Sequence, residues 1–337
     1  MVVRVDLDEL HQHCMALLTD AGLPAEAAGT AAYHLLDADL RGLRSHGVAM
    51  LPSYLACIKA GGVSRETEAR VATDSDGLVI LDGRHALGQL TSAQATDLVT
   101  QRARRLGIGA VGVRHAHHFG AASTWSIRIA EAGMIGIALS NSAPMMPVPG
   151  GRAAVIGNNP ISIAAVGSDG RPVVADLAAS VGSVAKIRAA ARHGEPIPDG
   201  WAHDVQGIPT TDPAEALAGT LAPIGDAKGF ALALLIEVLT GVLTGGPYGA
   251  AVSKFSVHPE KPNDCAHLFI AIDPGSALRA GVAAGVAALA ATVDAADVAG
   301  AHVPGRWRSD LAAEQLKTGV AVDRMVLEQL GFSGRTW

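Results

Sequence analysis

The stretch RRLGIGAVGVRHAHHFGAAS, residues 104–123, decides the fold of this chain. Gly107, Gly109 and Gly112 stand in it in the register G-x-G-x-x-G, the spacing of a dinucleotide-binding loop. Such a loop follows a strand and opens a helix, so that the pyrophosphate meets the helix N-terminus. Here the glycines follow the helical pattern ATDLVTQRARRL and lead into the β-branched run AVGVRH. The order is reversed, so we interpret Gly107 as the end of a helix and expect a fold other than the Rossmann fold.

Outward from this stretch, the chain changes from helical patterns to short strand patterns. Asp6 is a candidate N-cap for a helix over residues 7–22, and Pro24 opens a second helix over residues 24–43. From residue 77, helical stretches alternate with the β-branched runs GLVILDG, GAVGVRHA, IGIALSNS, ISIAAV, PVVADLA and HLFIAID. We therefore expect an α/β protein. Its mixed-sheet domain spans residues 77–276, and its helical domain is formed by residues 1–76 and 277–337.

The composition excludes several classes of protein. A hydrophobic fraction of 49% with 17% charged residues is typical of a folded globular chain of this length, 337 residues. The net charge is −6, and no run of Lys and Arg occurs, which argues against nucleic-acid binding. A small soluble molecule is the partner that we expect.

Cysteine usage and apolar runs indicate the compartment. Cys14, Cys57 and Cys265 are odd in number and far apart, which favours neither a disulfide framework nor a thiolate zinc site. The N-terminus, MVVRVDLDELHQHC, is acidic where a signal peptide needs an apolar core. The run FALALLIEVLTGVLTGG is interrupted by Glu237 and Gly241 and is too short to span a bilayer. We expect a cytoplasmic protein without a membrane span.

Two histidine motifs are candidates for acid–base chemistry. RSHGV places Ser45 and His46 between two helical patterns, and RHAHHFG places His115, His117 and His118 at the end of a strand. A histidine titrates near neutral pH and can donate a proton, although either motif taken alone is more often structural. The spacing H-x-H-H also occurs in metal sites, but no Asp, Glu or Cys nearby completes a ligand set. We expect no metal.

A third candidate segment is APIGDAKGFALALLIEVL, which presents Lys228 and Gly229 at the start of an apolar helix. A cation beside free backbone N–H groups at a helix N-terminus suits an anionic cofactor group. The segment lacks the Walker pattern of a phosphate-binding loop. Taken alone, it also fits a solvated lysine beside a helix start.

Taken in order, these segments resemble the type 2 malate/L-lactate dehydrogenase family, whose relatives include ureidoglycolate, sulfolactate and diketogulonate oxidoreductases and piperideine-carboxylate reductases. The resemblance runs from about residue 5 to residue 310, through DLRGLRSHGV, VRHAHHFGAAS, AEAGMIGIALSNS, GNNPISIA, ADLAAS, IPDGWAHDVQGIPTTDP and PIGDAKGFALALLIEVL. It implies an NAD(P)-dependent oxidoreductase with a non-Rossmann mixed-sheet cofactor domain and a helical domain. It also implies a homodimer with the active site between the domains.

The resemblance implies roles for individual residues. Ser45, His46 and His118 match the family's reaction site, and Asp204 of GWAHD matches a position that we assign to orienting His46. The implied cofactor contacts are Ser142, Asp176, Leu177, Ala178, Lys228, Gly229, Pro304 and Gly305. The sequence leaves the choice between NAD and NADP open, because it lacks the acidic residue that a Rossmann fold would offer.

Some positions depart from the family pattern. After S-H-G-V the family has an arginine, which we expect to bind the substrate carboxylate, whereas SHGVAMLP has Met50. A thioether cannot replace a bidentate guanidinium. The carboxylate is then bound by Arg44 or Arg114, or the substrate is not a simple 2-oxo acid. Arg306 stands where the family's P-G-E segment has Glu, and GDAKG adds an acidic residue beside the expected cofactor site.

The function that we expect is hydride transfer between a nicotinamide and a small 2-oxo or 2-hydroxy acid, with a histidine managing the proton. Met50 favours an alternative, the reduction of a cyclic 2-imino acid or of a less acidic carbonyl compound. A catalytically silent, nucleotide-binding paralogue is a second alternative. The presence of both His46 and His118 argues against it.

Overall fold

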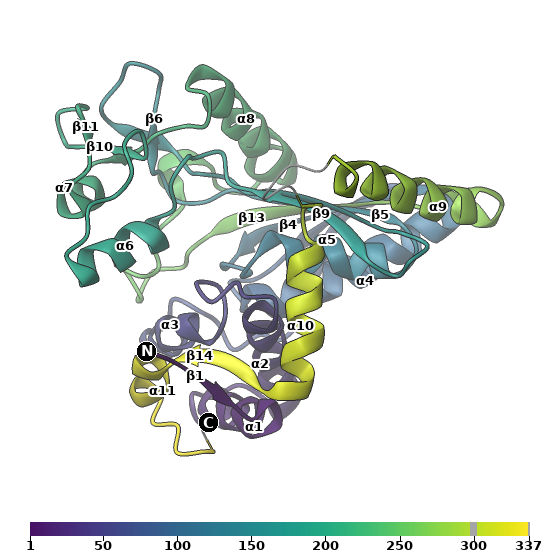
Figure 1. Ribbon diagram of the computed structural model, residues 1–337, viewed down its shortest axis with the longest axis horizontal. Coiled ribbons are helices and arrows are strands. Elements are labelled where there is room, and N and C mark those ends of the chain that lie inside the picture. The colour runs from purple at the N-terminus through teal and green to yellow at the C-terminus, as the bar shows by residue number, and fades with distance from the viewer. Residues whose placement is uncertain (297–301, 336–337) are drawn as a thin grey trace.

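The computed structural model describes residues 1–296 and 302–335. One part of the molecule is a seven-stranded sheet with helices on both faces, and the other is a bundle of helices (Figure 1). Helix α10 (Arg306–Thr318) contacts both parts, through β9 (Pro172–Leu177) of the sheet and α2 (Ala25–Leu40) of the bundle. The bundle and the sheet therefore adjoin each other, and α10 crosses the boundary between them.

The large sheet has the strand order β2-β3-β4-β13-β5-β8-β9. All neighbouring strands are antiparallel except β3 and β4, which are parallel. The remaining strands are β2 (Arg70–Ser75), β3 (Leu78–Asp82), β4 (Ile108–Ala116), β5 (Ile135–Ser140), β8 (Ile161–Val166) and β13 (Cys265–Ile272). A Rossmann sheet is mostly parallel, so this order confirms the expected mixed, non-Rossmann sheet.

Helices cover both faces of the sheet because its central strands are apolar on both sides. Adjacent residues of a strand point to opposite faces. In β13, Phe269 packs with Trp125 of α5, whereas Leu268 packs with Ile236 of α8 on the other face. The covering helices are α4 (Gly88–Leu106), α5 (Ala122–Glu131) and α8 (Ala227–Glu237), the last continued by a π-helical turn (Val238–Val242).

The three glycines of the G-x-G-x-x-G pattern serve helix–strand packing. Gly107 ends α4 with a φ of 84°, in the left-handed region that favours glycine. Gly109 and Gly112 lie in β4, where a Cβ would lie 2.8 Å from Arg102 Cβ and 2.6 Å from Thr244 Cγ2, respectively. The helix-to-strand order predicted from the sequence is confirmed.

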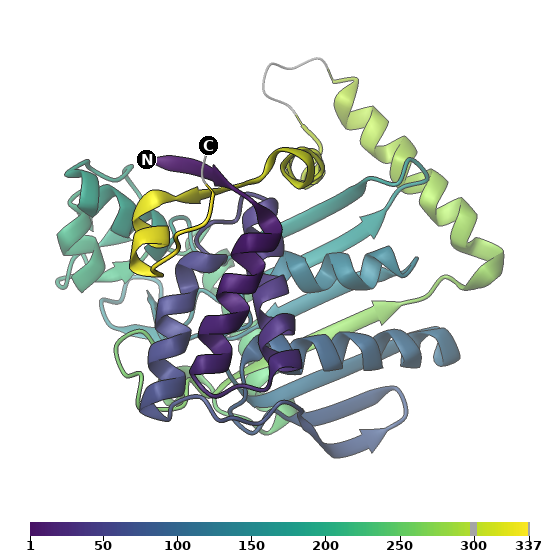
Figure 2. The same ribbon diagram turned by 90° about the horizontal axis from the view of Figure 1, so that it is seen from below.

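The helical bundle consists of α1 (Leu7–Asp20), α2, α3 (Leu51–Ala60) and α11 (Arg324–Gln329). Asp6 accepts hydrogen bonds from the N–H groups of Asp8 and Glu9, which confirms it as an N-cap. The bundle also holds an antiparallel pair of short strands, β1 (Val2–Val5) and β14 (Val320–Asp323), which brings the two ends of the chain together (Figure 2). Neither strand was predicted.

A smaller layer lies beyond the sheet and has its own apolar core, which includes Met146, Ile187 and Leu221. It contains α6 (Val184–His193), α7 (Pro213–Ala218), β6 (Met146–Pro147), β7 (Ala154–Ile156), β10 (Ala202–His203), β11 (Pro209–Thr210) and β12 (Thr220–Leu221). The structure also has two single 3₁₀ turns, Val48–Met50 and Gly249–Ala251.

Two elements lie outside the domains that the sequence predicted for them. β2 falls in the predicted helical range 1–76 but pairs with β3 at the sheet edge. α9 (Gly275–Asp294) falls almost wholly in the predicted helical range 277–337 but packs along β8, where the Ser168 N–H bonds to the Ala283 carbonyl at 2.9 Å. The chain returns to the bundle only with α10.

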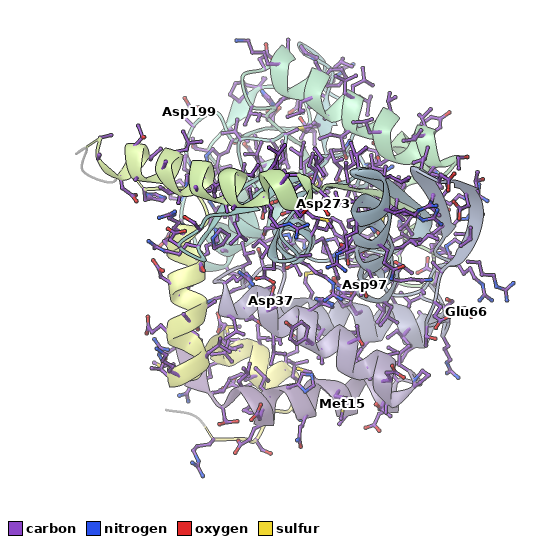
Figure 3. All side chains as sticks on the ribbon, turned by 90° about the vertical axis from the view of Figure 1, so that its right-hand side faces the viewer. Met15, Asp37, Glu66, Asp97, Asp199 and Asp273 are labelled. Atoms are coloured by element: carbon purple, nitrogen blue, oxygen red, sulfur yellow. The ribbon has the colours of Figure 1, made fainter. Side chains whose placement is uncertain are left out.

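α9 is apolar and mostly uncovered. In the described residues it is the one helix that meets the length and hydropathy criterion for crossing a membrane, with a mean hydropathy of 1.5. Leu278 and Leu289 are exposed along it. Near its N-terminus, Arg279 makes an ion pair at 3.0 Å with Asp273, which marks the start of this helix in Figure 3. This ion pair and the contact with β8 attach the helix to the sheet.

Candidate functional site

The S-H-G motif forms a turn between α2 and α3 that Asp39 fixes from inside. The Asp39 carboxylate is buried and accepts a hydrogen bond from the Val48 N–H at 2.7 Å. The His46 N–H bonds to the Leu43 carbonyl at 2.8 Å, and the Ser45 hydroxyl lies 2.9 Å from His46 Nδ1. The backbone and one ring nitrogen of His46 are therefore both positioned locally.

His118 follows β4, and hydrogen bonds define its tautomer. Its Nδ1 lies 2.7 Å from the Tyr54 hydroxyl and accepts a weaker hydrogen bond from the Gly120 N–H at 3.4 Å. Gln89 Nε2 donates to the same hydroxyl at 3.2 Å, so the hydroxyl proton is directed to His118. Because Nδ1 accepts, the neutral ring carries its proton on Nε2.

The two histidines meet across the boundary between the bundle and the sheet. Their rings stack with centroids 5.9 Å apart. Burial lowers the pKa of His118 well below its ordinary value, and the neighbouring His46 and His117 lower it further. Burial also lowers the pKa of His46, where Asp176 raises it and Arg308 lowers it. Both rings are therefore mostly neutral at pH 7.

The other histidines of RHAHHFG point to different partners. His115 lies 3.0 Å from the Asp82 carboxylate at Nδ1. His117 is buried beside Tyr54 and Phe255, with ring centroids 5.5 and 4.8 Å away. Within the described residues, no group of three His, Cys, Asp or Glu side chains has the arrangement of a metal site.

The segments expected to contact the cofactor are linked by hydrogen bonds. Ser142 Oγ donates to Asn158 Oδ1 at 3.0 Å, and the Asn158 carbonyl accepts from the Ala179 N–H at 2.7 Å. The Ala179 carbonyl in turn accepts from the Ile224 N–H at 2.9 Å. These bonds place Ser142, the end of β9 and the segment before α8 side by side.

The N-terminus of α8 has features that suit an anion. Lys228 is exposed in its first turn, and no side chain caps the helix start. Gly229 is required by close packing, because a Cβ there would lie 2.5 Å from the Ile224 carbonyl and 2.8 Å from the Ala179 carbonyl. The helix start therefore sits directly against the segment that follows Asp176, Leu177 and Ala178.

Pro304 and Gly305 also lie against β9. The Pro304 carbonyl accepts from the Val174 N–H at 3.0 Å, and Gly305 is the residue from which α10 begins. Arg306, which stands where the family has Glu, is buried and makes an ion pair with Asp169 at 2.8 Å. The change from an acidic residue in the family to a basic one here is thus matched by an acidic partner, Asp169, on the turn between β8 and β9.

The structure places Asp204 in a turn, and the role assigned to it in orienting His46 stays a prediction. Its carboxylate accepts hydrogen bonds from the N–H groups of Gln206 and Ile208 at 2.8 and 2.9 Å and so holds the turn between β10 and β11. In the described part of the chain, the carboxylate that acts on the His46 charge is Asp176. The motif GWAHD is therefore a turn motif here, and Ser45 is the hydrogen-bond partner of His46.

The three residues considered for the substrate carboxylate have different environments. Met50 is partly buried and packs against the core of the bundle. Arg114 pairs with Asp82, with 3.4 Å between Nε and the nearer carboxylate oxygen. Arg44 is exposed, and the charge on which it acts is Asp39.

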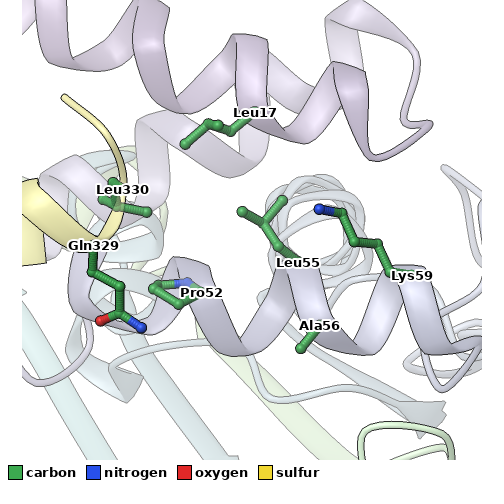
Figure 4. A pocket seen from close by; sticks show the side chains of 7 residues that line it. All are labelled: Leu17, Pro52, Leu55, Ala56, Lys59, Gln329 and Leu330. Atoms are coloured by element: carbon green, nitrogen blue, oxygen red, sulfur yellow. The ribbon is translucent and has the colours of Figure 1, made fainter. Parts of the chain in front are cut away.

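A hollow in the helical bundle lies apart from these residues. It has a volume of about 400 Å³ and separates α1, α3 and α11 (Figure 4). Its lining consists of Leu17, Pro52, Leu55, Ala56, Lys59, Gln329 and Leu330. Lys59 is its one titratable side chain, so the hollow offers little for acid–base chemistry.

Sequence reasoning missed three residues that hold the two histidine segments in place: Asp39, Tyr54 and Gln89. Asp39 precedes the S-H-G motif by less than two helical turns, and an acidic residue inside an apolar pattern is the signal that could have found it. Tyr54 and Gln89 carry no such signal, because only the fold brings them to His118.

Comparisons with known proteins cover both parts of the molecule. Residues 5–331 match the sequence model of a family described as malate/L-lactate dehydrogenase. A (2R)-3-sulfolactate dehydrogenase (NADP(+)) of Chromohalobacter salexigens is 38% identical over 270 residues, 80% of this chain and 81% of that protein. Ureidoglycolate dehydrogenase (NAD(+)) of Escherichia coli K12 is 35% identical over 272 residues, 81% of this chain and 77% of that protein. A solved delta1-piperideine-2-carboxylate reductase of Pseudomonas syringae has a TM-score of 0.89 at 29% identity and covers 97% of this chain and 98% of that one.

Proposed function

The chain belongs to the malate/L-lactate dehydrogenase family, and from that premise we propose that it transfers a hydride between NAD or NADP and C2 of a small 2-oxo or 2-hydroxy acid. Membership makes the protein an NAD(P)-dependent oxidoreductase. The observation that carries the proposal is the pairing of His46 and His118 beside β9, whose end adjoins the anion-suited start of α8.

The residues fit a nicotinamide cofactor. The uncapped N-terminus of α8 and the exposed Lys228 suit its phosphates, and the Ser142 hydroxyl and the β9 segment lie beside them. When bound, the nicotinamide supplies or accepts the hydride. The protein holds the substrate at the two histidines and manages the proton.

The histidines take different roles in this proposal. Neutral His118 donates a hydrogen bond from Nε2 to the carbonyl oxygen of the substrate, because Tyr54 and Gly120 occupy its Nδ1. His46 in its protonated form gives the proton to that oxygen as the hydride reaches the carbon, and Asp176 favours this form. In the reverse direction His46 takes the proton from the 2-hydroxyl group.

The test uses His46→Ala and His118→Ala with pyruvate, oxaloacetate and a panel of other 2-oxo acids. Each variant should lower turnover by roughly two to four orders of magnitude, the range of general acid–base catalysis, while NADH binding measured by fluorescence stays within a few-fold.

Reduction by the wild-type protein should decline as the pH rises past the pKa of His46, which lies below its usual 6.5. That decline should persist in His118→Ala and vanish in His46→Ala. Wild-type turnover in both variants would refute the proposal, and the opposite pH behaviour would exchange the two roles.

A second candidate function is the reduction of a cyclic 2-imino acid. The similarity to a piperideine-carboxylate reductase and Met50 in place of the family's arginine favour it. The same panel decides, because a cyclic imine turned over with a higher kcat/KM than any 2-oxo acid would select this alternative.

The proposal extends to a homodimer in the cytoplasm. α8 and its π-helical turn expose the apolar side chains Leu234, Leu235, Val238, Leu239, Val242 and Leu243, more than a monomer usually leaves in one place. Cys14, Cys57 and Cys265 are buried free thiols, which suits a reducing compartment. Sedimentation of the purified protein measures the oligomeric state.

A further inference from the structure

A 2-oxo acid needs a cation beside the carbon that reacts, and this inference rests on the proposed function. Its carboxylate is adjacent to the carbonyl group, so the cation must lie close to His46 and His118. A guanidinium suits this task because its N–H groups match the two carboxylate oxygens. Met50 cannot perform it, and its side chain packs against the core of the bundle.

Two arginines considered from the sequence are poorly suited. Arg114 is paired with Asp82, and its Nε is buried without a hydrogen bond in the described part of the molecule. A guanidinium that is already paired with one carboxylate attracts a second carboxylate only weakly. Arg44 is exposed to solvent, and water weakens the attraction of an exposed charge for an anion.

Arg308 lies against the start of the turn that carries His46. It belongs to the first turn of α10, and its charge acts on both His46 and Asp176. It is partly buried, and its Nη1 donates to the Arg41 carbonyl at the end of α2 at 3.1 Å. One face of the guanidinium lies over the Trp307 ring, 4.3 Å from the centroid. These contacts hold the group beside Arg41 and Gly42, where the turn that carries His46 begins.

A comparison with Arg306 shows that Arg308 has N–H donors available for a ligand. Arg306, two residues earlier, has Asp169 at 2.8 Å and Asp294 at 3.8 Å. Among the described residues Arg308 has no carboxylate within 4.0 Å, and the Arg41 carbonyl is its one hydrogen-bond acceptor. A guanidinium has five N–H donors, so most of those of Arg308 remain for a ligand.

We propose that Arg308 binds the carboxylate of the substrate beside His46 and His118, in place of the arginine that Met50 replaces. The anchor thus comes from α10, late in the chain, and not from the turn that carries His46. Arg308 is then a residue that determines specificity for 2-oxo acids over neutral carbonyl compounds.

The experiment compares Arg308→Gln and Arg308→Lys with the wild-type protein on pyruvate and on methyl pyruvate, which lacks the charge. KM for pyruvate should rise about 10- to 100-fold in Arg308→Gln, with kcat within a few-fold, because the anchor contributes to binding before the reaction. KM for methyl pyruvate should stay within a few-fold. Arg308→Lys keeps the charge but loses the bidentate geometry, so its KM for pyruvate should lie between the other two. Lys317→Gln, on the exposed last turn of α10, is the matched control and should behave as wild type.

The outcomes separate this inference from the proposed function. An unchanged KM for pyruvate in Arg308→Gln, with turnover in the wild type, overturns the role of Arg308 alone. A selective loss of NADH or NADPH affinity in that variant also overturns it, because Arg308 would then bind the cofactor. Absence of turnover by the wild-type protein on every 2-oxo acid overturns the proposed function and this inference with it. If Arg308→Gln fails to fold in a melting experiment, Arg308→Lys decides by the same comparison of the two substrates.

Discussion

At the scale of single residues, Tyr54 decides which nitrogen of His118 can serve the substrate. Its hydroxyl lies 2.7 Å from His118 Nδ1 and also accepts from Gln89, so it has one direction in which to donate. Without that donor, the ring could carry its proton on either nitrogen. Tyr54 is therefore a positioning residue in the proposed mechanism, although it is far from His118 in the sequence.

We expect Tyr54→Phe to lower kcat by roughly 10- to 100-fold, a part of the usual contribution of acid–base catalysis, with little change in KM for NADH. The phenyl ring keeps the packing against His117 and Phe255, so the melting temperature should change little. Tyr33→Phe is the matched control, because Tyr33 is exposed on α2. Steady-state kinetics over a pH series provide the measurement. A Tyr54→Phe protein with wild-type kcat at every pH would show that the tautomer of His118 is fixed by something else.

At the scale of elements, we expect different effects from substitutions at the start of α8 and at the glycines of β4. The first should weaken cofactor binding, and the second should lower stability. Lys228→Ala removes an exposed cation from the proposed phosphate site, and NADH binding should weaken by roughly 1 to 3 kcal/mol, the value of a charge-assisted hydrogen bond. Lys59→Ala, exposed at the end of α3, serves as the control. Fluorescence titration with NADH and NADPH gives the dissociation constants.

Gly109→Ala should instead lower stability and leave the affinity of the folded protein for NADH nearly unchanged. The added Cβ would lie 2.8 Å from Arg102 Cβ, so α4 and β4 must move apart. Overpacking of this kind costs about 1 to 3 kcal/mol, which a shift in melting temperature reports. If Gly109→Ala weakened NADH binding more than Lys228→Ala, the cofactor would have to lie at β4 after all.

At the scale of the whole molecule, buried histidines make the fold sensitive to acid. Burial lowers the pKa of His34 and His117 to about 3 and that of His267 to about 4. Between these values and 6.5, the unfolded chain binds protons that the folded chain does not, so the free energy of unfolding falls as the pH falls. Asp39 opposes this, because burial raises its pKa to about 7 and the folded state keeps its proton.

These three histidines less Asp39 leave an excess of about two protons in the unfolded chain, a loss of about 3 kcal/mol per pH unit between pH 6.5 and 4, and His46 and His118, whose pKa burial also lowers, steepen it. Denaturant unfolding at pH 7.5, 6 and 5 measures the slope. His34→Gln lies outside the proposed site and should reduce the slope by about one proton. A free energy of unfolding that stays constant from pH 7.5 to 5 would contradict the neutral state of these rings in the fold.

Sequence reasoning reached those parts of the fold and site that local patterns encode. The N-cap Asp6 indicated α1, Ala-rich composition indicated α9, and the order of motifs indicated His46 and His118. It missed β1, because a four-residue strand is defined by its distant partner. It placed α9 in the bundle, because an apolar helix does not reveal which neighbour covers it. Arg308 was missed for the same reason, since its position follows from how α10 docks on α2 and β9.

The pairing of β1 with β14 also has a consequence for synthesis. Val5 leaves the ribosome long before Val320 and must wait for it before its strand is completed. At roughly 5 to 20 residues per second, that wait is on the order of half a minute. During most of it, the large sheet lacks β13, the strand that joins β4 to β5, and the bundle that carries His46 lacks β14 and α11. Both the sheet and the bundle therefore stay incomplete until β13 and β14 have been made, and a chaperone has access to the helices α1 to α3 until then.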